Sequence, residues 1–182
     1  MGSDKVFNEF DTKKLKNLND FTDTHPAYRA NLQIKLINGG YSSYQSEYPY
    51  PMTTRNGSIT SPLSSLANKE ADNNYIIIKN IFHEPFQETF YAYLVNYSEK
   101  KIEKKYILKS NTVNFIEIDN DLIKPDIFLV TQKYLGIPIY ISVKNKSLSF
   151  EHTHPPHSYI VSTDKFSKVF KLKKELNEII SQ

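Results

Sequence analysis

Three of the chain's five histidines stand within six positions, at His152, His154 and His157. Neutral imidazole is a common ligand for transition metals, so this cluster could hold an ion. In a strand, His152 and His154 would point to the same face with their Cα atoms about 6.5 Å apart. Both imidazoles could then reach one ion at about 2.1 Å. The segment is therefore a candidate metal site for Zn, Fe, Mn, Ni or Cu.

The remaining ligands of such a site are harder to supply. Pro155-Pro156 imposes an extended step of about 3.1 Å per residue, which places His154 and His157 about 9 Å apart at Cα. That separation is near the upper limit for sharing one ion. Glu151 would point to the opposite face of a regular strand. A distant residue, such as His83, Glu84 or His25, would have to complete the ligand shell.

The pair His152-Thr153-His154 resembles the first metal motif of the cupins, and the resemblance covers those two histidines. It implies a β fold with a bound transition metal. Cupins place a glutamate several residues downstream and carry a glycine-rich second motif with another histidine. Here Ser158-Tyr159-Ile160 follow, and no glycine occurs after Gly136. The chain departs from the family pattern at both points.

The same residues also fit a reading without a metal, which we favour. The Pro-Pro step can form a rigid turn that leads from a sheet into a helix. The imidazoles would then donate to backbone carbonyls, stack on tyrosines or contact a partner.

A second candidate surface is rich in tyrosine. Residues 41–61 hold few aliphatic residues and many turn formers, which indicates an irregular stretch at the surface. Tyrosine offers a large contact area and a hydroxyl at low entropic cost, so the stretch could bind a sugar or an extended peptide. The candidate ligand-binding residues are Tyr41, Tyr44, Tyr48, Tyr50, Arg55 and Tyr159.

The composition excludes several classes of function. The chain has no cysteine, so it has no disulfides and no thiolate ligands. Its net charge of +3 comes almost entirely from lysine, since Arg29 and Arg55 are the only arginines. We therefore expect no nucleic-acid partner, because guanidinium groups usually make those contacts. No secretory signal and no membrane-spanning run is present, so we expect a cytoplasmic location and no membrane partner.

The hydrophobic pattern predicts the fold class. From residue 75 onward, strands of period two or continuous apolar runs recur about every 10–12 residues between turn signals. This predicts an all-β, antiparallel β-sandwich of the immunoglobulin-like or jelly-roll type. The expected divisions are an N-terminal arm or short helix at 1–24, the sandwich at 25–162 and a C-terminal amphipathic helix at 163–182. Within the last division, the apolar stripe predicts a helix at about 164–180.

Two functions follow from these observations. The first is a binding or interaction module whose His/Tyr-rich surface takes a protein or carbohydrate. The alternative is a small metalloprotein or cupin-like metalloenzyme that uses His152, His154 and His157. Whether the chain is an enzyme is left open by the sequence.

Overall fold

The computed structural model describes residues 30–46, 57–80, 86–152 and 164–182. About half of these residues lie in strands, and the last described segment is a helix. The strands are β1 (Ala30–Lys35), β2 (Tyr41–Ser46), β3 (Ser58–Ile59), β4 (Asn73–Lys79), β5 (Thr89–Asn96), β6 (Lys101–Lys109), β7 (Val113–Ile118), β8 (Ile127–Thr131), β9 (Pro138–Lys144) and β10 (Ser147–His152). The helices are the short 3₁₀ turns η3 (Leu63–Ser65) and η4 (Asn120–Leu122) and the helix α3 (Asp164–Ile180).

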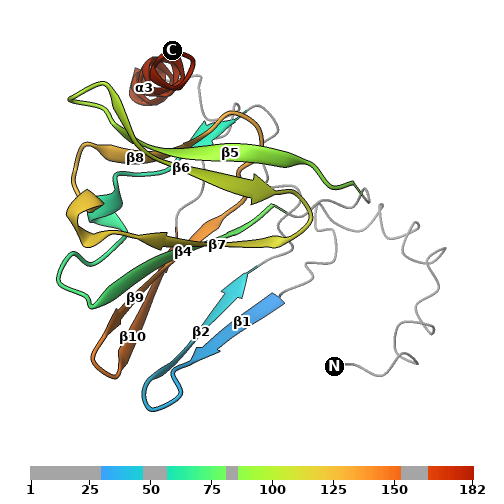
Figure 1. Ribbon diagram of the computed structural model, residues 1–182, viewed down its shortest axis with the longest axis vertical. Coiled ribbons are helices and arrows are strands. Elements are labelled where there is room, and N and C mark those ends of the chain that lie inside the picture. The colour runs from blue at the N-terminus through green and yellow to red at the C-terminus, as the bar shows by residue number, and fades with distance from the viewer. Residues whose placement is uncertain (1–29, 47–56, 81–85, 153–163) are drawn as a thin grey trace.

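The strands form three antiparallel sheets (Figure 1). We name the sheet β3-β8-β5-β6 the helix-side sheet and the sheet β10-β9-β4-β7 the hairpin-side sheet. The third sheet is the β1–β2 hairpin. These elements lie in the order α3, helix-side sheet, hairpin-side sheet, β1–β2 hairpin (Figure 1). The predicted mostly-β fold with antiparallel sheets and a C-terminal helix is confirmed.

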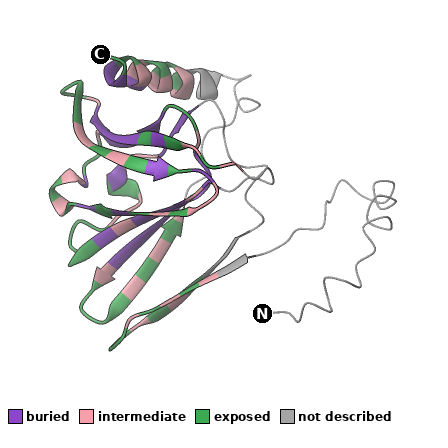
Figure 2. Ribbon diagram, turned by 45° about the vertical axis from the view of Figure 1, so that its right-hand side comes forward, coloured by how far each residue is buried: buried purple, intermediate pink, exposed green. Residues whose placement is uncertain are grey.

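The two four-stranded sheets share the largest hydrophobic cluster. Alternate residues of β4 face inward, including Ile76 and Ile78, which are fully buried. Alternate residues of β5 meet them from the helix-side sheet, including Ala92 and Leu94. Branched aliphatic side chains fit a pleated surface, which is why the apolar run of residues 75–78 forms a central strand. Figure 2 shows this burial in the strands between the outer layers.

Helix α3 covers the outer face of the helix-side sheet. Its buried residues Leu176, Ile179 and Ile180 share a cluster with Val95 and Val130. The helix begins and ends at the predicted residues, because its apolar stripe has the helical period and this sheet face offers a matching surface. The Tyr97 hydroxyl also donates to Glu175 and ties the β5–β6 turn to the helix.

The β1–β2 hairpin covers part of the outer face of the hairpin-side sheet. Leu32 and Ile34 pack there against a cluster built on Ile77, Ile139 and Ile141. The tip of the hairpin is fastened by the Gly40 N–H, which donates to the Lys146 carbonyl at 2.6 Å. A Cβ on Gly40 would lie 2.7 Å from that carbonyl oxygen, so this close approach requires glycine.

One local prediction was wrong. Tyr41–Ser46, within the stretch predicted to be irregular, is a strand, because its backbone pairs with β1. The turn η4 connects β7 of one four-stranded sheet to β8 of the other.

Candidate interaction surface

The structure describes one of the three clustered histidines. His152 ends β10, with a half-buried side chain on the outer face of the hairpin-side sheet. Its backbone N–H donates to the Glu151 carboxylate at 2.9 Å, and its Nδ1 lies 3.9 Å from the same oxygen. His154 and His157 lie outside the described residues. Among the residues that are described, no group of three or more potential metal ligands gathers. The three-histidine site therefore stays a prediction.

The predicted tyrosine surface is described only at its beginning. Tyr41 opens β2 with 58% of its side chain exposed. Tyr44 lies in the same strand opposite Leu32. Four further candidates lie outside the described residues: Tyr48, Tyr50, Arg55 and Tyr159.

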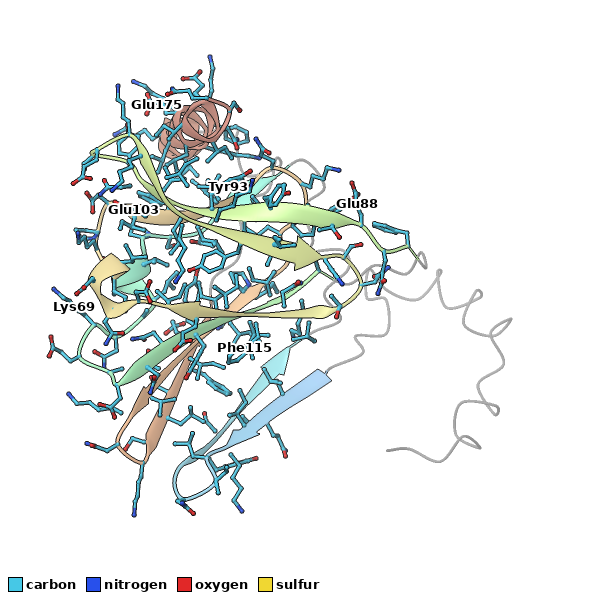
Figure 3. The ribbon with its side chains drawn as sticks, viewed as in Figure 1. Lys69, Glu88, Tyr93, Glu103, Phe115 and Glu175 are labelled. Atoms are coloured by element: carbon cyan, nitrogen blue, oxygen red, sulfur yellow. The ribbon has the colours of Figure 1, made fainter. Side chains whose placement is uncertain are left out.

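Large exposed apolar side chains gather instead on two strands that end their sheets. β6 is the last strand of the helix-side sheet and β7 is the last strand of the hairpin-side sheet. β6 exposes Ile102 and Ile107, and β7 exposes Val113 and Phe115. Phe115 points from β7 toward the side of the β1–β2 hairpin (Figure 3). This surface was not predicted from the sequence, because its residues are not of chemically distinctive types.

The exposed side chains of β7 extend the apolar outer face of the hairpin-side sheet, which the β1–β2 hairpin covers in part. The strand register forms a row across the outer face of the hairpin-side sheet, from Phe115 through Ile77 and Ile139 to His152. Ile77 and Ile139 are buried, whereas Phe115 is 61% exposed. The Phe115 ring also lies 4.9 Å from the Tyr75 ring, centroid to centroid. The apolar face therefore extends beyond the described side chains that cover it.

Lys79 lies beside this face, opposite the exposed Val113. Its side chain is about half-buried, and this desolvation lowers the pKa of its ammonium group.

Among the described residues, no strand pairs with the outer edge of β7. In an antiparallel ladder, alternate residues of an edge strand direct both N–H and C=O away from their neighbour. The Ile78 carbonyl points toward β7, where it meets the Asn114 side chain at 3.3 Å. The Glu117 carbonyl points the other way and accepts from the Tyr106 hydroxyl. The backbone groups of Val113 and Phe115 therefore point outward as those of Glu117 do, and no described residue caps them.

The neighbouring edge of β6 is capped at Lys109 and carries lysines along its length. The Lys109 N–H donates to Asn114 Oδ1 at 2.8 Å, and Asn114 Nδ2 donates to the Lys109 carbonyl at 2.9 Å. Further along, Lys104 pairs with Asp119 at 2.9 Å. Lys105 stands over the exposed Tyr91 ring at 3.6 Å. Such lysine-rich, capped edges discourage the addition of another strand.

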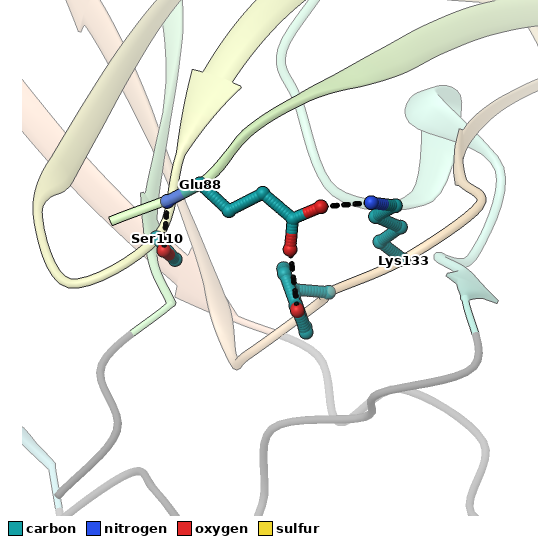
Figure 4. A network of polar contacts seen from close by, with 4 residues as sticks. Glu88, Ser110 and Lys133 are labelled. Atoms are coloured by element: carbon teal, nitrogen blue, oxygen red, sulfur yellow. Dashed lines mark hydrogen bonds and ion pairs between the residues drawn. The ribbon is translucent and has the colours of Figure 1, made fainter. Parts of the chain in front are cut away.

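The polar network at Glu88 has a structural role (Figure 4). Its carboxylate accepts from Lys133 and from the Tyr134 hydroxyl, and its backbone N–H donates to Ser110 Oγ at 2.8 Å. The hydrogen bond from Lys133, followed by that from Tyr134, lowers the pKa of Glu88. The carboxylate is thereby held in its charged form beside an ammonium group. It fastens the start of β5 to the segment after β8 and does not provide a base tuned to neutral pH.

In the part of the chain that is described, no helix is both long and apolar enough to cross a membrane. No protein-family model matches the chain, and comparisons with curated proteins and with solved structures found no match.

Proposed function

We propose that this chain is a binding module that holds a partner polypeptide on β7. The observation that carries the proposal is that, within the described residues, Val113 and Phe115 expose apolar side chains and their backbone groups meet no further strand. The scaffold of the proposal is a β-sandwich of the immunoglobulin-like or jelly-roll type. The sharing of one core by the two four-stranded sheets supports this scaffold.

The physical reason is that a sheet edge and an apolar face supply different parts of recognition. Backbone groups at a free edge give affinity for any extended segment. Side chains that alternate along the added strand then meet the neighbouring face, which gives specificity. At β7, specificity would come from the Phe115 ring, which lies beside Tyr75, and from the aliphatic side chain of Val113.

Panning a phage-displayed library of random linear peptides on the immobilised full chain tests the proposal. The selected peptides should no longer bind the Phe115→Lys variant, because it places a cation at the centre of the face. They should still bind the Ile107→Lys variant, which makes the same change at a comparably exposed residue of β6. Peptides that bind both variants equally, or a library that yields no binders, would remove the proposal.

The alternative function is a metalloprotein centred on His152, His154 and His157. What favours it in the described residues is the Glu151 carboxylate near Nδ1 of His152, since carboxylates often orient ligating imidazoles. Elemental analysis of untagged protein should then find near-stoichiometric Zn, Fe, Mn, Ni or Cu, which His152→Ala removes. Protein that stays metal-free after incubation with these ions would contradict this alternative.

A further inference from the structure

We infer that the partner held on β7 is a second copy of this chain, paired antiparallel through β7 about a two-fold axis at Asn114. This inference rests on the proposed function and names the occupant of the same site. It would join the two hairpin-side sheets into one continuous sheet. Three features support this pairing: the sheet edges that are free to add a strand, the register, and the side chains that the register brings together.

Of the four edges of the two larger sheets, β7 is the one suited to pairing. On β6, the Asn114 side chain occupies both backbone groups of Lys109, and lysines flank the rest of the strand. β3 contains two residues, too few for a ladder. The edge of β10 begins at the Lys146 carbonyl, which the Gly40 N–H already occupies, and β2 lies alongside it.

One register matches the unpaired backbone groups with each other. Val113 would pair with Phe115 of the partner subunit, and Phe115 with Val113 of the partner subunit. Both are outward-facing residues, so each pair can exchange two backbone hydrogen bonds. A register shifted by one residue in the partner would place inward-facing residues opposite outward-facing ones and is excluded.

The next allowed register, centred on Phe115, is less favourable. It would place Val113 opposite Glu117 of the partner subunit, whose carbonyl already accepts from Tyr106. It would also put an aliphatic side chain opposite a carboxylate. The register centred on Asn114 instead sets Glu117 opposite Asn111 of the partner subunit, so no like charges meet.

The side chains agree with the chosen register. Val113 and Phe115 of each copy would cover one another on the outer face, next to Tyr75. An isologous interface presents each contact twice, so one apolar pair becomes two. The pairing also accounts for the contrast within β7, where Ile116 is buried in the core and its neighbour Phe115 is exposed.

Sedimentation equilibrium of the full chain from about 1 to about 500 µM tests the inference. Wild-type protein should dimerise reversibly. Phe115→Lys should weaken the dimer at least about tenfold, since the interface loses this side chain twice. Ile107→Lys is the matched control and should leave the dimer unchanged. A monomer throughout the range, or a dimer that Phe115→Lys does not weaken, would overturn the inference.

A backbone variant guards against misfolding of the lysine variant. Val113→Pro removes an N–H that faces the outer edge at the first residue of the strand, where proline is tolerated and the ladder to β4 loses no bond. The variant should unfold as the wild type does and remain monomeric. A Val113→Pro protein that dimerises with wild-type affinity would contradict pairing through the β7 backbone.

Cysteine cross-linking tests the register, and the absence of native cysteine keeps the background clean. Paired residues in this register have Cα atoms about 5.5 Å apart, within disulfide range. A mixture of Val113→Cys and Phe115→Cys proteins should cross-link, and either variant alone should do so much less. Efficient cross-linking of Phe115→Cys alone would overturn the register. If wild-type protein is monomeric but library peptides still bind β7, the second copy is wrong and the proposed function stands.

Discussion

β6 and β7 are consecutive strands joined by a short turn, and each ends a four-stranded sheet, yet their edges differ. Along β6, one asparagine side chain satisfies both backbone groups of Lys109, and lysines flank the strand. Along β7, the outward backbone groups of Val113 and Phe115 have no such cap among the described residues. Both strands expose large apolar side chains, so exposure alone does not separate them.

The difference lies in what surrounds each edge. Outside the helix-side sheet, α3 packs on residues of β5 and β8, and Lys105 of β6 stands over the exposed Tyr91 ring at 3.6 Å. The face outside β4 and β7 is apolar and is covered only in part by the β1–β2 hairpin. An uncapped edge beside a partly uncovered apolar face is costly to leave in water, which supports the proposal that β7 binds a partner.

The largest expected effect compares two neighbours on β7. Ile116→Ala should lower the free energy of unfolding by about 2–5 kcal/mol, because the side chain is buried in the shared core. Phe115→Ala should cost less than about 1 kcal/mol, measured at a concentration where the chain is monomeric. Urea unfolding of both variants measures the contrast. Equal losses would show that Phe115 is part of the core of the monomer.

The second prediction concerns the cover of the hairpin-side sheet. Gly40→Ala should detach the hairpin tip, because the added Cβ would meet the Lys146 carbonyl oxygen. We expect a loss of about 1–3 kcal/mol and faster amide exchange in β1 and β2. Ile37→Ala, at a tip residue that is 97% exposed, is the control and should change neither quantity. An undisturbed hairpin in Gly40→Ala would show that this close approach is not required.

The third prediction concerns the cap that Asn114 places on the β6 edge. Asn114→Ala should cost about 1 kcal/mol and speed amide exchange at Lys109, because the N–H of Lys109 loses its acceptor. Asn114→Asp keeps an acceptor oxygen at that position and should retain more of the protection. Protection at Lys109 that survives Asn114→Ala would mean that another group closes the β6 edge.

The smallest expected effect is a pH dependence at the start of β5. The folded-state pKa of Glu88 is lowered by Lys133 and Tyr134, so its contribution to stability is present above the pKa of the unfolded chain. That contribution is lost as the pH falls through the folded-state pKa. Between about pH 5 and about pH 3, wild-type protein should therefore lose more stability than Glu88→Gln. Parallel thermal unfolding curves for both proteins over this range would contradict the assignment.

Much of the fold was predictable because its signals are local. The period-two strands and the helical stripe of residues 164–180 arise from neighbouring residues, and the structure confirms them. The candidate surface was not predictable, because an edge is a non-local property. The sequence of β7, VNFIEI, has apolar residues on both faces of the strand. The positions of β4 and β6 around β7 decide which of these residues are exposed to water. The histidine and tyrosine clusters were predicted as sites because of their residue types, but most of their residues lie outside the described ranges.

Amide hydrogen exchange at Val113 and Phe115, followed against protein concentration, tests the central claim most directly. In dilute solution both amides should exchange fast, while those of Asn114 and Ile116, which face β4, stay protected. Rising concentration should then protect Val113 and Phe115 together, as the edge becomes paired. Strong protection of both amides at the lowest concentration would contradict the account, because the chain itself would already pair the β7 edge.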